Sequence, residues 1–125
     1  GDYRFDVVLW RHVLEHLDNP LDILERLRLF LKPSGRMVLC VPCESGDNLP
    51  DTNDLDHHLF CWNRRTLGNL LTRAGYDVEK ICFEYYGGKR KLVWVYRFFG
   101  GQRYSCAVRL IGRIFGFKEI VAIAR

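Results

Sequence analysis

The segment from Phe5 to Pro42 constrains the fold more than any other part of the chain. An apolar run over residues 5–10 is followed by a helical pattern from Asp18-Asn19-Pro20 to about Leu31, and then by a second apolar run over residues 36–42. Apart from Asp6 and Arg36, both runs are apolar rather than alternating, which is typical of parallel strands that are covered on both faces. A strand, a helix and a strand in this order predict a βαβ unit within an α/β fold.

The predicted helix of this unit has signals at both ends. Asp18 or Asn19 can cap its first turn, and Pro20 suits the first helical position because the N–H that Pro lacks would be unpaired there. Pro33 and Gly35, in the turn Lys32-Pro33-Ser34-Gly35, end the helix. Apolar residues recur with a period near 3.6 and form its inner face: Leu21, Ile23, Leu24, Leu27, Phe30 and Leu31.

The rest of the chain continues the α/β pattern. Asn63 can cap a helix over Arg65–Ala74 that ends at Gly75, and the partly alternating stretch from Tyr76 to Tyr86 predicts a strand. We expect a single partial domain, divided into a strand–helix–strand core (1–42), a loop (43–63), a helix and a strand (64–86), a basic aromatic insertion (87–118) and a final strand (119–125).

Length and composition restrict the class of protein. A chain of 125 residues with 48% hydrophobic and 27% charged residues predicts one packed domain at most. The sequence contains no apolar run near the ~20 residues that span a bilayer, and its start does not resemble a secretion signal. Five cysteines, an odd number, favour free thiols in a reducing compartment, so we expect a cytoplasmic location.

A group of polar residues follows the first predicted strand. His12, Glu15 and His16 are spaced i, i+3 and i+4, which places them on one face of a helical turn. They also follow the carboxyl end of a strand, where open α/β sheets bind ligands. They either hold the strand–helix turn through hydrogen bonds to the backbone or line a ligand site. The pattern also matches an inverted zinc-hydrolase motif, which the preceding strand disfavours because that motif lies within a long helix.

Cysteines and histidines offer a second candidate cluster. Cys40 and Cys43 form a C-x-x-C pair that could join His57 or His58 and Cys61 around zinc. Cys40 lies inside a predicted buried strand, where a thiol acts as a small apolar group. We therefore expect no bound metal and no redox role for this pair.

Residues 87–118 differ in composition from the rest of the chain. They contain eight of its 19 basic residues, no acidic residue, and seven interleaved Trp, Tyr and Phe residues. Residues 103–115 predict an amphipathic helix. This segment is either a cap over the sheet with basic side chains at its rim, or a contact surface for a membrane or a lipid substrate. Nucleic-acid binding is the less favoured alternative.

Four motifs identify a family resemblance. The runs FDVV, HVLEHL, LKPSGR and VLCVP closely resemble the fourth and fifth strands of class I S-adenosylmethionine-dependent methyltransferases, particularly the small-molecule enzymes of the ubiquinone and menaquinone type. The resemblance covers residues 1–82 and 119–125. It implies the carboxyl-terminal half of a Rossmann-like sheet, with strands four to seven, flanking helices and an antiparallel last strand. The Gly-rich cofactor turn that follows the first strand of such enzymes has no match here.

The resemblance also implies site residues and a function. Arg11 and His12 would contact S-adenosylmethionine, and His12, His16 and His58 would be the catalytic residues, with His58 rather than His57 directed to the acceptor from an active-site loop. The implied reaction is methyl transfer to a small molecule, lipid- or quinone-like. A fragment without the cofactor turn would be inactive alone and would not bind S-adenosylmethionine tightly. The alternative is a non-catalytic binding or scaffold module with a methyltransferase-like fold.

The resemblance implies an unpaired strand edge as well. The family places its first strand beside its fourth, so residues 5–10 would have a free edge in this chain. Free strand edges recruit other chains, and we therefore expect self-association through this strand.

Overall fold

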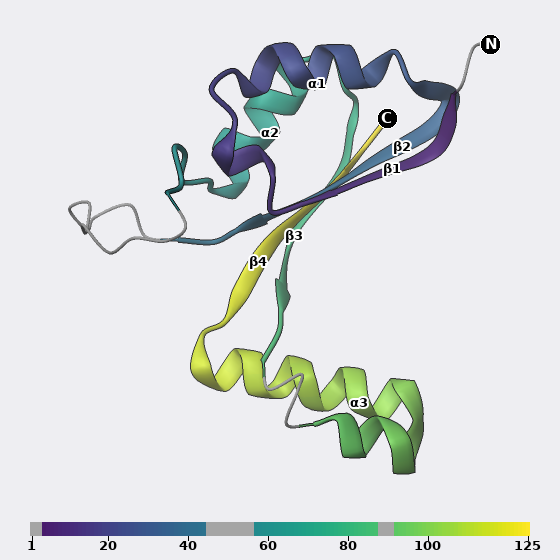
Figure 1. The fold of residues 1–125 in the computed structure, drawn as a ribbon, viewed down its shortest axis with the longest axis vertical. Helices are drawn as coiled ribbons and strands as arrows, with labels where there is room; N and C mark the ends of the chain where they lie inside the picture. Colours follow the sequence, from purple (N-terminus) through teal and green to yellow (C-terminus); the bar gives the residue numbers. More distant parts are fainter. Residues whose placement is uncertain (1–3, 45–56, 88–91) are drawn as a thin grey trace. The chain divides into compact units, whose positions relative to one another are not determined.

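The computed structural model describes residues 4–44, 57–87 and 92–125, and these ranges contain one four-stranded sheet with flanking helices (Figure 1). The strands have the order β1-β2-β4-β3. Their bounds are Phe5–Arg11 for β1, Leu31–Pro42 for β2, Val78–Tyr85 for β3 and Lys118–Ala124 for β4. The chain forms two compact units, one of Gly1–Cys82 with Ile120–Arg125 and one of Phe83–Glu119. The predicted α/β class is confirmed.

Strands β1 and β2 pair in parallel, as the βαβ pattern predicts. The register runs evenly from Val7 beside Arg36 to Arg11 beside Cys40, and it is irregular before Val7. The close approach of the two strands requires Gly35, because a Cβ atom there would lie 2.7 Å from the Phe5 carbonyl oxygen. The carboxyl ends of both strands therefore lie together at one edge of the sheet.

The helix between them, α1 (Pro20–Arg28), starts as predicted and ends earlier. Its first turn is capped by Asn19, whose side-chain oxygen accepts from the Asp22 N–H at 3.4 Å. Its predicted extension to Leu31 is wrong, and the turn expected at residues 32–35 belongs to β2. The Phe5 N–H donates to the Phe30 carbonyl at 2.7 Å. Because this carbonyl bonds to β1, the chain continues as a strand instead of forming another helical turn.

Helix α2 (Arg64–Arg73) agrees closely with the prediction. Asn63 forms a capping box, since its side chain accepts from the backbone of Thr66 while the Thr66 hydroxyl accepts from the backbone of Asn63. Leu67 and Leu71 are completely buried. The chain leaves the helix through Gly75, whose φ of 85° favours glycine.

A buried tyrosine links α1 to the start of β3. The Tyr76 hydroxyl donates to the Leu24 carbonyl at 2.9 Å, and this hydrogen bond is buried. Desolvation raises the pKa of Tyr76 to about 12, and the nearby charge of Arg28 opposes this rise. The hydroxyl is therefore a permanent donor at physiological pH.

The last strand, β4, runs antiparallel to β3, as predicted. At one end of the pair Asp77 and Arg125 exchange backbone hydrogen bonds of 2.7 and 2.9 Å, and at the other the Tyr86 N–H donates to the Phe117 carbonyl. The start of β3 therefore pairs with the end of β4, and the end of β3 with the start of β4, which is the antiparallel arrangement.

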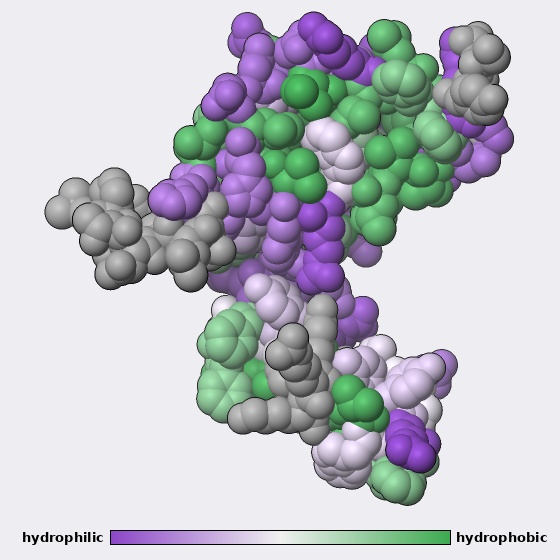
Figure 2. Space-filling model, in the orientation of Figure 1, coloured by the Kyte–Doolittle hydropathy of each residue, from purple (hydrophilic) through white to green (hydrophobic). Residues whose placement is uncertain are grey.

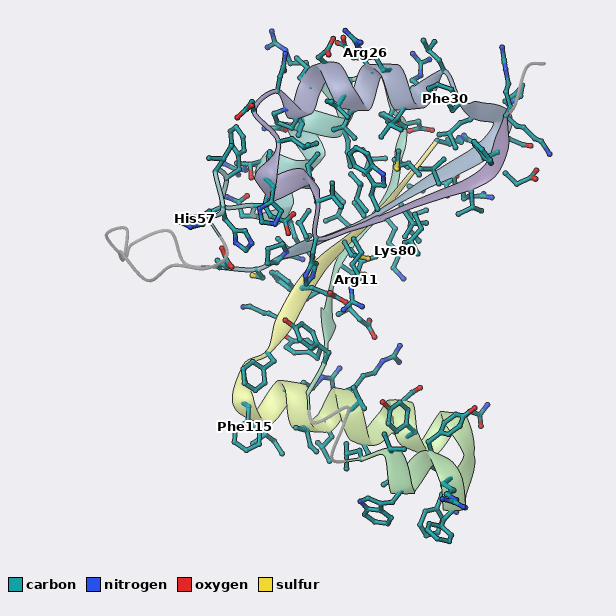
Figure 3. The ribbon with its side chains drawn as sticks, in the orientation of Figure 1. Arg11, Arg26, Phe30, His57, Lys80 and Phe115 are labelled. Atoms are coloured by element: carbon teal, nitrogen blue, oxygen red, sulfur yellow. The ribbon has the colours of Figure 1, made fainter. Side chains whose placement is uncertain are left out.

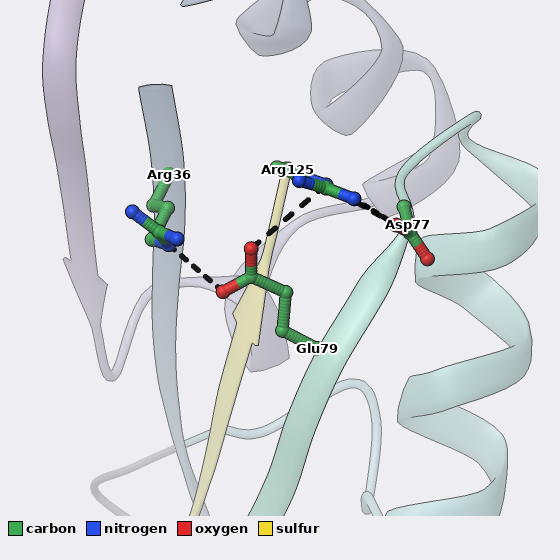
Figure 4. A network of polar contacts seen from close by, with 4 residues as sticks. All are labelled: Arg36, Asp77, Glu79 and Arg125. Carbon is green, nitrogen blue, oxygen red and sulfur yellow. Dashed lines mark hydrogen bonds and ion pairs between the residues drawn. The ribbon is translucent and has the colours of Figure 1, made fainter. Parts of the chain in front are cut away.

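Charged side chains reinforce this part of the sheet (Figure 4). Arg36 of β2 reaches across β4 to Glu79 of β3 at 2.8 Å, and Arg125 contacts Asp77 at 3.2 Å and Glu79 at 3.9 Å. The hydrogen bond from Arg36 lowers the pKa of Glu79 below its usual value. These pairs are solvent-accessible, so they specify the register of the strands more than they stabilise the fold.

Helix α3 (Val93–Phe115) is two helical segments joined at Gly100, whose φ of 81° and ψ of 172° are not helical. The second segment contains the predicted amphipathic helix over residues 103–115. Across the described ranges, no helix has both the length and the apolar character that crossing a bilayer requires.

The expectation that β1 is covered on both faces is wrong for this chain. Phe5, Val7 and Leu9 are 51%, 57% and 63% exposed, and Figure 2 shows hydrophobic residues gathered over this part of the sheet. The physical reason is the position of the helices, because α1 and α2 both lie on one face of this part of the sheet (Figure 1) and the odd-numbered side chains of β1 share the other face.

We predict that the chain self-associates through β1, most simply as a twofold dimer. Replacing Val7 and Leu9 by Lys should yield monomers, because charged side chains on an edge strand oppose strand addition. Sedimentation velocity at rising protein concentration measures this. Leu29→Lys is the matched control, since Leu29 is 72% exposed and lies outside β1. An unsubstituted chain that stays monomeric at high concentration contradicts the prediction.

Candidate functional site

The candidate site begins where β1 ends. Arg11 is the last residue of the strand, and His12 follows it with its N–H donating to the Cys40 carbonyl of β2 at 2.9 Å (Figure 3). His12 has a φ of 52°, in the left-handed region that non-glycine residues rarely adopt. Strained backbone of this kind is frequent at functional sites. The expectation that His12 lies on a helical turn with Glu15 and His16 is wrong, because His12 precedes the turn.

The turn itself is a short 3₁₀ helix, η1 (Leu14–His16), and Glu15 is its buried centre. Glu15 is 0% exposed, and both oxygens of its carboxyl group have no hydrogen-bond partner among the described residues. The proposal that this side chain holds the turn by bonding to the backbone is therefore wrong. The backbone of Glu15 has that role, since its carbonyl accepts from the N–H groups of Leu59 and Phe60 at 2.8 and 3.3 Å.

This backbone contact places two histidines side by side. The rings of His16 and His58 lie with their centroids 4.8 Å apart in an edge-to-face arrangement. The Nδ1 atom of His58 lies 2.9 Å from an oxygen of Glu44, which follows β2. A carboxylate beside Nδ1 orients an imidazole and favours the tautomer that carries its proton on Nδ1.

Three of these side chains could hold a metal ion. The ligand atoms of Glu15, His16 and His58 all lie within 4.8 Å of one another. Imidazole and carboxylate ligands together suit zinc and other divalent transition metals. Within the described ranges, this is the single group of three or more potential ligands, and the cysteines considered from the sequence do not belong to it. Cys40 is buried in β2 and Cys61 is exposed.

The predicted site residues thus separate into two sets. His16 and His58 lie together, whereas Arg11 and His12 lie at the strand end and outside that cluster. His57, labelled in Figure 3, is exposed and has a φ of 45°. The catalytic and cofactor roles of these residues remain predictions.

Sequence reasoning missed Glu44 and the isolation of the Glu15 carboxyl group. Glu44 lies in a loop with several acidic residues, and no spacing rule distinguishes it from them. Glu15 was recognised as part of the H-x-x-E-H pattern, but its burial depends on packing against residues 57–60, which are distant in sequence. Neither feature has a local signal.

Residues 1–81 match a protein family described as the methyltransferase domain. Two solved structures resemble the whole chain. A candidate methyltransferase from Bacillus halodurans C-125 has a TM-score of 0.59 and 16% identity, and the similarity covers 99% of this chain and 65% of that one. The cyclase SpnF has a TM-score of 0.61 and 14% identity, covering 99% of this chain and 50% of that one. No curated protein matches the chain.

The chain belongs to the methyltransferase domain family, and its sheet is of the class I type that the sequence motifs indicated. It spans less than two thirds of one similar structure and half of the other. The two structures share the fold of this chain, and their low identity extends the comparison no further.

We predict that Glu15→Met raises the free energy of unfolding by about 1–3 kcal/mol, because it removes a buried polar group that lacks a partner and keeps a similar volume. Chemical denaturation measures this, with Glu25→Met on the exposed side of α1 as a control that should change little.

The opposite result identifies a metal site. If Glu15→Met destabilises the protein and abolishes a rise in melting temperature that Zn²⁺ or Mn²⁺ causes in the unsubstituted chain, then the expectation of no bound metal is wrong.

Proposed function

We propose that this chain is the carboxyl-terminal part of an S-adenosylmethionine-dependent methyltransferase that acts on a small, lipid- or quinone-like molecule. The observation that supports this most strongly is the family match over residues 1–81, which includes both parallel strands, His12 and the turn η1 that contains His16. The antiparallel β4 between β2 and β3 agrees with the same family.

The position of the site supports this function. Ligands of open α/β sheets bind outside the carboxyl ends of the strands, and Arg11, His12 and η1 all follow the carboxyl end of β1. The sulfonium of S-adenosylmethionine is an activated methyl donor, so the protein must supply orientation and, for a hydroxyl or carbon acid, a base.

We assign roles to the site residues on this basis. Arg11 and His12 contact the methionine end of the cofactor, since they lie where β1 leaves the sheet. His12 also faces the acceptor as its base. His16 and His58 form the second wall of the acceptor pocket, where Glu44 orients His58. The residues of this chain fit one end of the cofactor, and the adenosine and ribose contacts require the Gly-rich turn that this sequence does not contain.

A non-catalytic binding module is the second candidate. SpnF shares this fold and is described as a cyclase, so the fold by itself does not fix the reaction.

Cofactor binding tests the division of the site. We expect the 125-residue chain to bind S-adenosylmethionine weakly or not at all, because half of the contacts are absent from it. Isothermal titration calorimetry measures this, with a complete class I methyltransferase as the positive control. Low-micromolar binding to the chain alone contradicts our statement that the cofactor site is incomplete here.

Substitution of His12 tests the catalytic assignment in a protein that joins this chain to a complete cofactor site. We expect His12→Ala to lower turnover by roughly 10²–10⁴-fold with nearly unchanged cofactor affinity, because the base is lost. His12→Gly is the matched control, since glycine adopts the left-handed backbone without strain. If His12 acts only through its backbone, the glycine variant keeps normal turnover and the assignment is wrong.

A further inference from the structure

The unit formed by Phe83–Glu119 differs in charge from the rest of the chain. It contains eight Lys and Arg residues and two acidic residues, a net charge of +6, whereas the whole chain has a net charge of +4. The remainder therefore carries −2. One of the two acidic residues, Glu84, pairs with Arg109 at 2.7 Å, and the other, Glu119, is buried. The surface charge of this unit is thus almost entirely positive.

The same unit exposes an apolar stripe. Cys106, Leu110 and Ile114 are spaced four residues apart on the second segment of α3, so they lie on one face of the helix. Leu110 and Ile114 are 60% and 67% exposed. We call these three residues the α3 stripe. A contiguous group of exposed apolar side chains often marks a surface that binds a protein, a membrane or a ligand.

The opposite face of the helix already has its partner. Val108 and Gly112 are buried, and a Cβ atom at Gly112 would lie 2.5 Å from the Tyr86 backbone nitrogen. These residues are offset by two positions from Leu110 and Ile114, which is about half a turn of helix. Helix α3 therefore packs within its own unit through the face of Val108 and Gly112, and the α3 stripe on the opposite face is exposed to solvent.

Aromatic and basic side chains accompany the stripe. Arg103 lies seven residues before Leu110, and Arg113 three residues after it, so both occur on the same side of the helix. The Arg103 guanidinium lies 5.7 Å from the centre of the Phe99 ring, and that of Arg113 lies 5.4 Å from the Tyr85 ring. Figure 2 shows apolar and weakly polar residues over α3 on the face in view, with few strongly hydrophilic ones.

The first segment of α3 adds further exposed rings near Gly100. The rings of Trp94 and Phe99 pack edge to face with their centroids 6.3 Å apart, and those of Tyr96 and Tyr104 do so with their centroids 5.8 Å apart. The large apolar residues of this segment that are more than half exposed are Val93, Trp94, Tyr96, Phe98 and Phe99. Trp and Tyr prefer the boundary between water and lipid, where the ring is apolar and its polar atom remains hydrated.

We propose that the α3 stripe and the neighbouring rings of Phe83–Glu119 bind the surface of an anionic lipid bilayer. The apolar side chains enter the acyl boundary, while Arg103 and Arg113 extend to the lipid phosphates. A net charge of +6 on this unit complements such a surface. The proposal concerns where the protein is held and does not depend on methyl transfer.

Two other occupants fit the observations less well. A second copy of the chain would bring two units of charge +6 together, which electrostatic repulsion opposes. Single-stranded nucleic acid would use the rings and the arginines, because bases stack on aromatic side chains, but it would leave the aliphatic Leu110 and Ile114 in water. A lipid surface accounts for the charge, the rings and the aliphatic residues together.

Vesicle binding by the full chain tests this proposal. We expect binding to vesicles of equal parts phosphatidylcholine and phosphatidylglycerol, much weaker binding to pure phosphatidylcholine, and a loss of binding in high salt. Arg103→Glu with Arg113→Glu should weaken partitioning at least roughly 30-fold, since each basic residue contributes about fivefold. Leu110→Ser with Ile114→Ser should weaken it about tenfold or more at constant charge.

Matched controls lie in the other unit. Arg4→Glu with Arg65→Glu makes the same change in charge at two exposed positions, and Leu29→Ser removes an exposed leucine. Both should leave vesicle binding nearly unchanged, and circular dichroism checks that each variant is folded.

Three results would each overturn the proposal. The unsubstituted chain fails to bind anionic vesicles, or the α3 variants bind vesicles as well as their controls do. The third is that the chain binds a single-stranded oligonucleotide in preference to vesicles. A dimer that the α3 substitutions dissociate, without vesicle binding, would assign this face to a second copy.

Discussion

The parallel pairing of β1 with β2 is the interaction on which the candidate site depends. Because parallel strands point the same way, Arg11 at the end of β1 and Cys40 of β2 lie side by side, and the chain leaves both strands at one edge of the sheet. The Cys40 carbonyl holds the His12 backbone in its left-handed conformation. A shift in register would move every functional group at this edge. Two residues of β2 oppose such a shift, since Gly35 permits the close approach of Phe5 and Arg36 pairs with Glu79 of β3.

A second constraint acts over a longer stretch of chain. The Glu15 carbonyl accepts two backbone hydrogen bonds from Leu59 and Phe60, so these residues contact η1 although they are distant from it in sequence. The same contact brings His58 beside His16, and His58 also contacts Glu44. Two histidines and two carboxyl groups thus come from three segments of the chain, and backbone hydrogen bonds as well as the His58–Glu44 contact hold them together.

Features with local causes could be predicted from the sequence, and features with distant causes could not. The caps at Asn19 and Asn63 act on N–H groups within three residues, so their spacing identifies them. The end of α1 depends instead on the hydrogen bond from the Phe5 N–H of β1 to the Phe30 carbonyl, and these two residues are distant in sequence. The exposure of Val7 and Leu9 depends on which face of the sheet the helices cover, and an apolar run looks the same in a covered strand and an uncovered one. In the site, His16 and His58 were predicted individually, but their contact with Glu44 requires the folded loop.

The two units of the chain place different demands on their side chains. In the first, apolar residues such as Leu24 and Leu67 are buried, and charged residues pair across the sheet. In the second, Val108 and Gly112 are the buried residues of α3, and many large apolar side chains are exposed. This unit has a net charge of +6, whereas the first has a net charge of −2. Exposed rings and aliphatic side chains gain little from folding, because they stay in contact with water. Contact with an apolar phase, as in the lipid binding that we propose, would bury them, whereas the apolar residues of α1 and α2 are already buried by packing within the first unit.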